Sequence, residues 1–369
     1  MGYIDSDTHV READSSWDYL DPGERQYRPT KNEQGAWVIG GVEWQRPFDV
    51  AVMPPEYNEV FPEGSVDLAV PSVRIERMDV LGVDVQVLFS SFWLNAEIES
   101  PIEEAALMRS WNRWMADRVA DAASRLLWTA EVPFRLAERA IAEMEFAKVH
   151  GAAGVHLSGL RHGATVAHPL YRPIYEKAQE LDLVIAVHVG GDARVFRGDR
   201  SIVMLNNLAP VPGAMYALYR MGVPAEFPDL KWAFVEAGAS WLPFVVQEAS
   251  RTDSSGNRVS RDWRDLAGTV LVENNFFVTC QIDDDLPYLQ RLFGVTNLVH
   301  GTDYSHMDLG SDPYGHHIIA SRADLEHDGA TMIVDANARR LWGIDPSFTP
   351  APVPELRPAI VEAASTWTR

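Results

Sequence analysis

Residues 183–191 read LVIAVHVGG, five apolar residues followed by His188, a valine and two glycines. The run is too short for a helix, and it lacks the polar alternation of a strand that has one face in water. It therefore predicts a strand that is buried on both faces. The polar His188 stands where the apolar run stops, and the two glycines allow a ligand to approach the backbone closely.

Seven further apolar runs of the same kind occur along the chain, at 3–9, 85–90, 126–131, 153–158, 232–236, 276–280 and 298–303. Helical patterns lie between most of them, at 72–81, 101–122, 136–149, 169–181, 213–221, 240–251, 285–293 and 331–342. Alternating strands and helices predict a parallel sheet, and eight strands allow it to close into a (β/α)8 barrel. An open doubly wound sheet is the alternative.

The spacing predicts one barrel domain over residues 1–345 and a Pro-rich tail over 346–369. Two connections are much longer than the rest, 10–71 after the first strand and 190–230 after the fifth. Connections of this length are typical of lids and binding loops. Both follow the carboxyl ends of strands, which is the active-site face of such a barrel.

The composition indicates a soluble globular protein, with 46% hydrophobic and 23% charged residues. A formal net charge of −21 argues against nucleic acid and against an anionic membrane surface as partners. The chain has one cysteine, Cys280, so it forms no internal disulfide. Without a signal-peptide pattern or a long apolar segment, the expected location is the cytoplasm.

Four polar residues stand at the ends of the predicted strands. Asp7 and His9 are two residues apart, so their side chains point to the same face of the first strand. His188 ends the fifth strand and Asp303 the eighth. Each alone is equally typical of a capping aspartate or a hydrogen-bonded core histidine. Together, two imidazoles and two carboxylates at one end of a barrel predict a divalent metal site.

Further candidates surround these four residues. Glu236 ends the sixth strand, and His306 follows Asp303 by three residues; both are candidate catalytic groups. Four residues are candidates for substrate binding, with a solvated loop or simple packing as the alternative: Arg194, Arg197, His156 and Trp241.

The chain resembles the amidohydrolase-related family typified by aminocarboxymuconate-semialdehyde decarboxylase. The matching segments, in the family's order, are IDSDTHV, PLYRPIYEKAQELDLVIAVHVGG, FVEAGASWLPF, HGTDYSHMD and DANARRLWGI. The resemblance implies a barrel with a single divalent metal, bound by Asp7 and His9 of an Asp-x-His motif, by His188 and by Asp303. Zinc is the first expectation, with manganese or iron as alternatives. Binuclear relatives have a bridging lysine on strand four, which AGVHLSG lacks.

One position departs from the family. The decarboxylases have a histidine at the end of strand six that acts in acid–base catalysis, where this chain has Glu236. A glutamate can carry a proton if burial raises its pKa, and it can equally orient a metal-ligand histidine.

The resemblance implies non-oxidative decarboxylation of a small aromatic or conjugated carboxylate. Metal-dependent hydrolysis of a C–C, lactone or amide bond at the same site is the alternative, because it would use the same residues. A catalytically silent binding barrel is a third, lesser possibility. A homodimer is the family expectation.

Overall fold

The computed structural model describes residues 2–44, 61–192, 200–251, 257–259, 262–306, 311–345 and 348. Eight parallel strands form one sheet, and they match the predicted runs to within a few residues at each end. In spatial order the strands are β1 (Tyr3–Val10), β5 (Val83–Ser90), β6 (Leu126–Glu131), β7 (Ala152–Ser158), β10 (Val184–His188), β11 (Trp232–Val235), β12 (Phe276–Cys280) and β13 (Leu298–His300).

The segment after β13 closes the sheet against β1. Strand β13 ends at His300, earlier than the predicted 303. The chain nevertheless runs on beside β1, where Thr8 and Tyr304 form a parallel bridge. The Asp303 amide donates to the Asp7 carbonyl and the His9 amide to the Tyr304 carbonyl, both at 2.9 Å. The predicted (β/α)8 barrel is therefore confirmed, with a seam that joins at the carboxyl ends of the strands.

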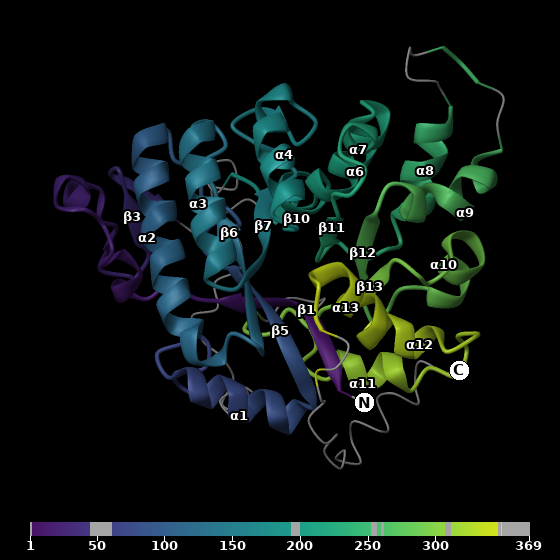
Figure 1. Cartoon of the computed structure of the whole chain (residues 1–369), viewed down its shortest axis with the longest axis horizontal. Coiled ribbons are helices and arrows are strands. Elements are labelled where there is room, and N and C mark those ends of the chain that lie inside the picture. The colour runs from purple at the N-terminus through teal and green to yellow at the C-terminus, as the bar shows by residue number, and fades with distance from the viewer. Residues whose placement is uncertain are drawn as a thin grey trace.

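Helices surround the sheet on its outer side (Figure 1). The main ones are α1 (Pro71–Leu81), α2 (Pro101–Val119), α3 (Ala137–Val149), α4 (Arg172–Glu180), α6 (Pro210–Arg220), α8 (Leu242–Ser250), α9 (Trp263–Glu273), α10 (Leu286–Phe293), α11 (Gly315–Ala320) and α13 (Asn337–Trp342). The sequence predicted neither α9 nor α11. The case of α9 has a physical reason. Its run Thr269-Val270-Leu271-Val272 has weak helix propensity because of the β-branched residues. Packing of its Leu266, Val270 and Leu271 face into the core overrides that preference.

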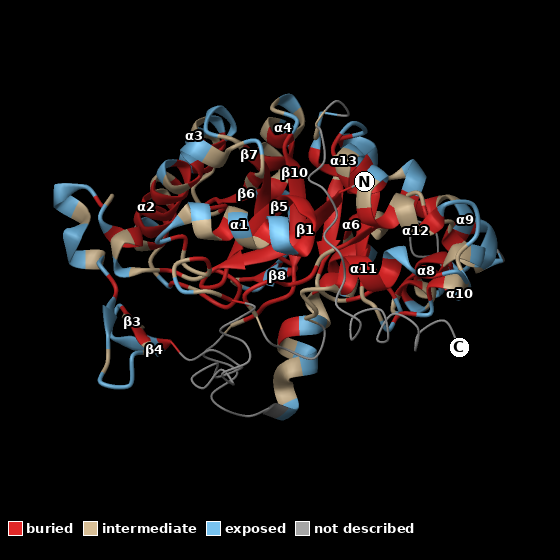
Figure 2. Cartoon of the chain, turned by 90° about the horizontal axis from the view of Figure 1, so that it is seen from below, coloured by how far each residue is buried: buried red, intermediate tan, exposed pale blue. Residues whose placement is uncertain are grey.

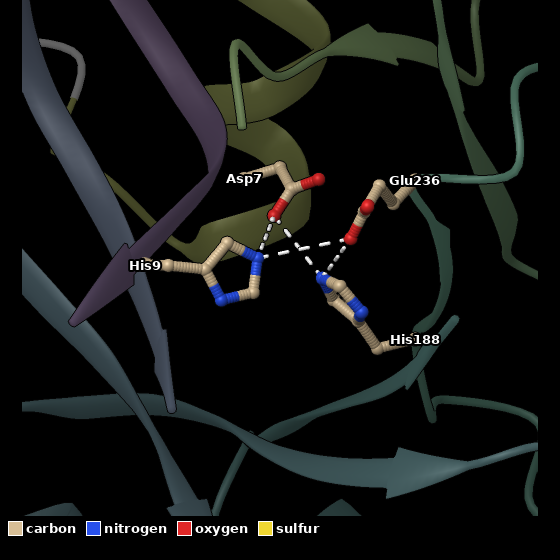
Figure 3. A group of neighbouring side chains, drawn as sticks. All are labelled: Asp7, His9, His188 and Glu236. Carbon is tan, nitrogen blue, oxygen red and sulfur yellow. Dashed lines mark hydrogen bonds and ion pairs between the residues drawn. The ribbon is translucent and has the colours of Figure 1, made fainter. Parts of the chain in front are cut away.

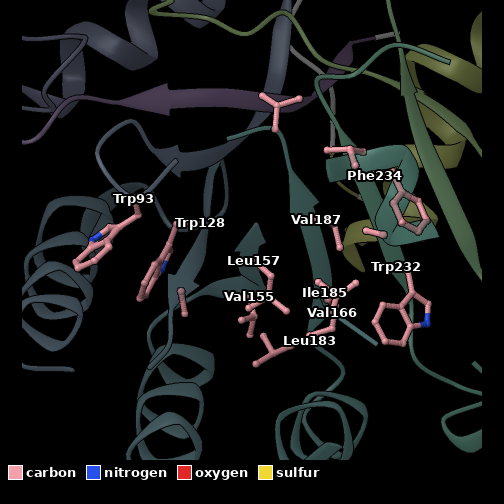
Figure 4. Packing of buried hydrophobic residues seen from close by; sticks show 14 of the residues in the cluster. Trp93, Trp128, Val155, Leu157, Val166, Leu183, Ile185, Val187, Trp232 and Phe234 are labelled. Carbon is pink, nitrogen blue, oxygen red and sulfur yellow. The ribbon is translucent and has the colours of Figure 1, made fainter. Parts of the chain in front are cut away.

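The protein has two hydrophobic layers. One lies between strands and helices, where Trp128, Val155, Ile185 and Trp232 belong to a continuous buried cluster (Figure 4). The other fills the barrel interior and ends at Trp342 of α13, whose indole Nε1 donates to Ser6 Oγ at 3.1 Å. The strands are buried on both faces, as the continuous apolar runs predicted (Figure 2).

The long connections contain structure of their own. The described part of 10–71 has two short 3₁₀ helices, Asp14–Trp17 and Pro22–Tyr27, and an antiparallel sheet of β2 (Thr30–Lys31), β3 (Trp37–Ile39) and β4 (Val42–Trp44). The connection 190–230 contains a π-helix, Met204–Leu208, before α6 and α7 (Val223–Glu226).

The division into a barrel of 1–345 and a tail stays a prediction. Of the tail, only Phe348 belongs to the described residues. Among the described helices, none has the length and apolar character needed to cross a membrane.

Candidate active site

Four side chains meet at the carboxyl ends of the strands, three of them buried and Glu236 partly exposed (Figure 3). Asp7 and His9 come from β1, His188 ends β10, and Glu236 directly follows β11. Asp7 Oδ1 lies 3.2 Å from His188 Nε2 and 3.4 Å from His9 Nε2. Glu236 Oε2 lies 3.4 Å from His188 Nε2 and 3.8 Å from His9 Nε2. One ligand atom of each residue can therefore face a common point.

Asp303 and His306 join this cluster from the segment after β13. Asp303 Oδ1 lies 3.2 Å from His9 Nε2 and 2.9 Å from His306 Nδ1, and Ser311 Oγ donates to Asp303 Oδ2 at 2.5 Å. The His306 ring stacks on the His9 ring with 3.8 Å between centroids, and its Nε2 pairs with Ser91 Oγ at 2.9 Å. Contacts with His306 and Ser311 therefore hold both oxygens of the Asp303 carboxylate in place.

Both carboxylates that follow a strand have an unusual backbone. Glu236 has φ 67° and Asp303 has φ 54°, in the left-handed region that L-residues rarely adopt. Each turns the chain at the strand end and so directs its side chain toward the barrel axis. Strained backbone of this kind is often found at functional sites, where the surrounding contacts hold the residue in place.

The protonation states suit metal binding. Burial lowers the pKa of His9 to about 4, so its imidazole is neutral at pH 7. Burial opposes ionisation of Asp7, but the interaction with His188, whose Nε2 lies 3.2 Å from Asp7 Oδ1, outweighs it and lowers the Asp7 pKa. The Nδ1–H of His188 donates to the Val189 carbonyl at 3.0 Å, which leaves Nε2 to face the cluster.

The donor set fits a divalent metal ion. Neither ring nitrogen of the buried His9 has a hydrogen-bond partner in the described part of the chain. A buried imidazole without a partner is costly unless a ligand such as a metal takes its lone pair. Donors that each lie about 2.1 Å from an ion are roughly 3 Å or more from one another, which matches the observed separations. Neutral imidazoles beside carboxylates are the donors that zinc, manganese and iron accept.

The predicted ligands Asp7, His9 and His188 thus lie together, with Asp303 adjacent through His9. The position of Glu236 differs from what the sequence predicted. The sequence offered it as a proton carrier or as an orienter of a histidine, whereas its carboxylate lies close enough to be a ligand itself. The ligand assignment stays a prediction.

Of the four predicted substrate-binding residues, the structure describes His156 and Trp241. His156 lies on β7, with its ring centroid 5.6 Å from that of His188, and pairs with Glu131. Trp241 directly precedes α8, and its Nε1 donates to the Gly238 carbonyl at 2.7 Å. Arg194 and Arg197 lie outside the described residues.

Three neighbours of the site were not singled out from the sequence. Glu131 gave the same signal as Asp7 and Asp303, a carboxylate at the end of an apolar run, and was missed. Ser91 and Ser311 gave no signal, because a serine in a loop has no distinguishing pattern. Only tertiary contact reveals their pairing with His306 and Asp303.

The chain is similar to known proteins both in sequence and in fold. The family model described as amidohydrolase matches residues 64–344. The structure is similar to an amidohydrolase from Mycobacterium avium subsp. paratuberculosis K-10, with TM-score 0.75, 18% identity and coverage of 93% of this chain and 99% of that one. No curated protein matches the sequence.

Two decarboxylases have the same fold. A 2,6-dihydroxybenzoate decarboxylase from Rhizobium has TM-score 0.64 and 17% identity, covering 94% of this chain and 99% of that one. A dihydroxybenzoic acid decarboxylase from Polaromonas sp. JS666, with bound manganese and the inhibitor 2-nitroresorcinol, has TM-score 0.63 and 17% identity, covering 93% and 97%. At these identities the likeness concerns the fold. Because the family model covers most of the barrel, the chain belongs to the amidohydrolase family.

Proposed function

We propose that this protein is a metal-dependent decarboxylase of a small aromatic or conjugated carboxylic acid. The observation that supports the proposal most is the buried cluster of Asp7, His9, His188, Glu236 and Asp303 at the carboxyl ends of the barrel strands. The dihydroxybenzoate decarboxylases with the same fold supply the reaction class.

A divalent ion bound by these residues would neutralise the negative charge of a substrate carboxylate or of an adjacent oxygen. Three carboxylates beside two imidazoles make manganese as suitable as zinc. The proposed ligands come from β1, β10 and the segments after β11 and β13, so the barrel scaffold would fix their mutual positions before any substrate binds.

Decarboxylation requires a proton at the carbon that loses its carboxylate. In the proposed reaction, the Asp303 or Glu236 carboxyl group donates that proton, the C–C bond to the carboxylate breaks, and carbon dioxide leaves. Asp303 is the better placed of the two for this role, because His306 Nδ1 lies 2.9 Å from Asp303 Oδ1 and can supply the proton that Asp303 passes to the substrate carbon. His306 additionally contacts Ser91, which fixes the orientation of the imidazole against Asp303.

The test combines metal analysis with a substrate screen. Purified protein is expected to bind about one equivalent of divalent metal, and the variants His188→Ala and Asp7→Asn are expected to bind at least tenfold more weakly. Loaded with zinc or manganese, the protein is screened against aromatic carboxylic acids and against lactones and C–C hydrolase substrates, with carbon dioxide release measured separately from acid production. Asp303→Asn is expected to abolish turnover, and the exposed Asp229→Asn serves as its control.

Each result has a clear meaning. Acid production without carbon dioxide would establish hydrolysis in place of decarboxylation. Less than a tenth of an equivalent of metal, together with no activity after metal addition, would exclude a metal enzyme and favour a silent binding barrel.

A further inference from the structure

The sharp turn after β11 sets the position of Glu236, and two of its first three residues have left-handed backbone. Glu236 has φ 67° and Gly238 has φ 63°. The turn directs the Glu236 carboxylate toward His9 and His188 (Figure 3). A glutamate in this conformation is strained, so it persists only where neighbouring contacts hold the backbone in place. Those contacts come from β12 and the residues that follow it.

Both backbone groups of Glu236 contact polar side chains of this neighbouring segment. Its amide donates to Thr279 Oγ1 at 2.8 Å, and the Thr279 hydroxyl in turn donates to the Phe234 carbonyl at 3.3 Å. Its carbonyl accepts from Gln281 Nε2 at 3.4 Å. The register of β11 and β12 ends at the pair Phe234 and Val278. Side chains, in place of strand pairing, therefore hold the backbone at Glu236.

Asp284 holds the rest of the turn with a single buried carboxylate. Its Oδ2 accepts from the Ala239 amide at 2.9 Å and from the Gln281 amide at 2.8 Å. Its Oδ1 accepts from the Ser240 amide at 2.9 Å and from the Ser240 hydroxyl at 2.5 Å. The residue is 6% exposed, so these four hydrogen bonds replace the water that a carboxylate otherwise binds. Asp284 thereby joins the turn after β11 to the segment after β12.

The turn and the segment of Asp284 are packed closely together. A Cβ added to Gly238 would lie 3.1 Å from Gln281 Oε1 and 3.4 Å from Asp284 Oδ2. On the backbone of the same segment, Arg322 Nη1 donates to the Ile282 and Asp284 carbonyls, both at 3.4 Å. The Asp284 segment is therefore anchored independently of the turn that its carboxylate holds.

We propose that Asp284 is a positioning residue that holds Glu236 in the left-handed conformation in which its carboxylate can bind the metal. It acts through the backbone of the turn and not through the Glu236 side chain. The inference deepens the proposed function, on which it rests only in taking Glu236 as a ligand. It assigns a role to β12 and residues 281–284, which supply none of the candidate ligands.

The first test is a double-mutant cycle on metal affinity, measured by titration with zinc or manganese. Asp284→Asn keeps the size of the side chain but replaces one accepting oxygen with an amino group, so two of the four donors lose their acceptor. It is expected to weaken metal binding about tenfold, in the range found for residues that orient metal ligands. In a Glu236→Gly background, the same change should alter the affinity less than about twofold, because the ligand that Asp284 positions is absent.

The second test needs no metal. Glu236→Gly and Glu236→Gln both remove the charge, but only glycine relieves the left-handed strain. In a chelator, the denaturant midpoint of Glu236→Gly is expected to exceed that of Glu236→Gln. When Asp284→Asn is added to both variants, this glycine–glutamine difference is expected to fall, because the turn no longer imposes the strained backbone.

Asp285→Asn is the matched control. This neighbouring carboxylate is exposed and caps α10 by accepting from the Tyr288 amide at 3.0 Å, a role that asparagine also fills. Metal affinity and the glycine–glutamine difference should both stay unchanged. If Asp284→Asn does not fold, Ser240→Ala removes a single hydrogen bond from the Asp284 carboxylate and is expected to change both quantities in the same direction, by less.

Equal losses of metal affinity from Asp284→Asn with and without the Glu236 side chain would overturn the inference, since they would show a general loss of structure. So would a glycine–glutamine difference that Asp284→Asn leaves unchanged. A wild-type protein that binds no metal would reject the proposed function. The metal-free comparison would then still decide whether Asp284 holds the Glu236 backbone.

Discussion

Glu236 combines two unfavourable features at one residue. Its backbone has φ 67°, and its carboxylate lies in a cluster that also contains Asp7 and, through His9, Asp303. Left-handed backbone at a residue other than glycine costs about 1 kcal/mol or more. Three neighbouring carboxylates also repel one another when no cation separates them. Glu236 is therefore expected to strengthen metal binding and to lower the stability of the metal-free protein.

Replacing Glu236 with glycine tests this trade-off. Glycine adopts positive φ without strain and removes one negative charge, so Glu236→Gly is expected to stabilise the metal-free protein by about 1 kcal/mol. The same change is expected to weaken metal binding at least tenfold. Denaturant unfolding in a chelator gives the first quantity and metal titration the second. Lower stability without metal would contradict the strain argument; Glu236→Gln, which retains the strain, is the control.

Two buried histidines each connect two elements of the barrel: His300 joins β13 to β12, and His316 joins α11 to β1. His300 ends β13 and donates from Nδ1 to the Cys280 carbonyl of β12 at 2.8 Å. His316 of α11 donates from Nε2 to the Ile4 carbonyl of β1 at 3.1 Å. Their rings meet at 4.7 Å and 75°. Burial is the main reason that the pKa of each falls to about 3, so both are neutral in the folded protein at pH 7.

These two histidines predict a loss of stability in mild acid. In the unfolded chain each imidazole takes up a proton near pH 6.5, whereas in the folded protein it does so only near pH 3. Between these values the unfolded state binds more protons, so the free energy of unfolding decreases as the pH falls. Each histidine contributes a slope of about 1.4 kcal/mol per pH unit.

The measurement is a series of denaturant unfolding curves from pH 7 to pH 4. His316→Gln retains an N–H donor for the Ile4 carbonyl but cannot be protonated, so its curve should be less steep by about one proton. The exposed His150→Gln should have the wild-type slope. An unchanged slope in His316→Gln would show that His316 is protonated in the folded protein.

The closure of the barrel depends on a seam between β1 and the segment after β13, where there is little space for additional side-chain atoms. A Cβ added to Gly301 would lie 2.2 Å from the Asp7 Cβ and 2.7 Å from the Asp7 backbone nitrogen. Here β1 and the segment after β13 approach closely, and the adjoining Thr302 donates to the Asp5 carboxylate from both its amide and its hydroxyl, at 2.9 and 2.6 Å. The seam therefore determines both barrel closure and the position of Asp7.

Gly301→Ala is expected to damage folding and metal binding together. The methyl group meets backbone, which cannot move away without opening the seam, so a loss of about 2 kcal/mol or more is expected. Thermal unfolding and metal titration check the two effects. Gly268→Ala provides the control, because this glycine is exposed in α9 with nothing near its added Cβ, and alanine there should stabilise slightly. Wild-type metal affinity in Gly301→Ala would contradict the role of the seam.

Trp342 closes the opposite end of the barrel interior. It packs with Val184, Ala233 and Phe277 in the inner cluster, and Gly154 leaves room for its ring at 3.2 Å from the position of an added Cβ. Trp342→Ala is expected to lower the free energy of unfolding by about 3–5 kcal/mol through the cavity it creates. The protein that remains folded should bind metal with wild-type stoichiometry, since the candidate ligands lie at the other end of the strands. A loss below about 1 kcal/mol would show that the interior repacks.

The sequence by itself determined the strands, their parallel arrangement and most of the candidate metal cluster. Apolar runs buried on both faces differ from helical patterns in length and period, and a carboxylate or imidazole at the end of such a run is visible without coordinates. This is why Asp7, His9, His188 and Asp303 were identified together with the barrel. It did not predict α9, because core packing there outweighs the weak helix propensity of its β-branched residues.

Only the tertiary structure decided how the site is completed. Glu236 lies among the candidate ligands because of its left-handed backbone, which no sequence pattern reveals. Glu131 pairs with His156, and Ser91 with His306, across separations of 25 and 215 residues along the chain. Strand ends are set by local periodicity, whereas such pairings depend on the register and closure of the whole sheet. The chemistry of the site therefore rests on contacts that exist only after the barrel has closed.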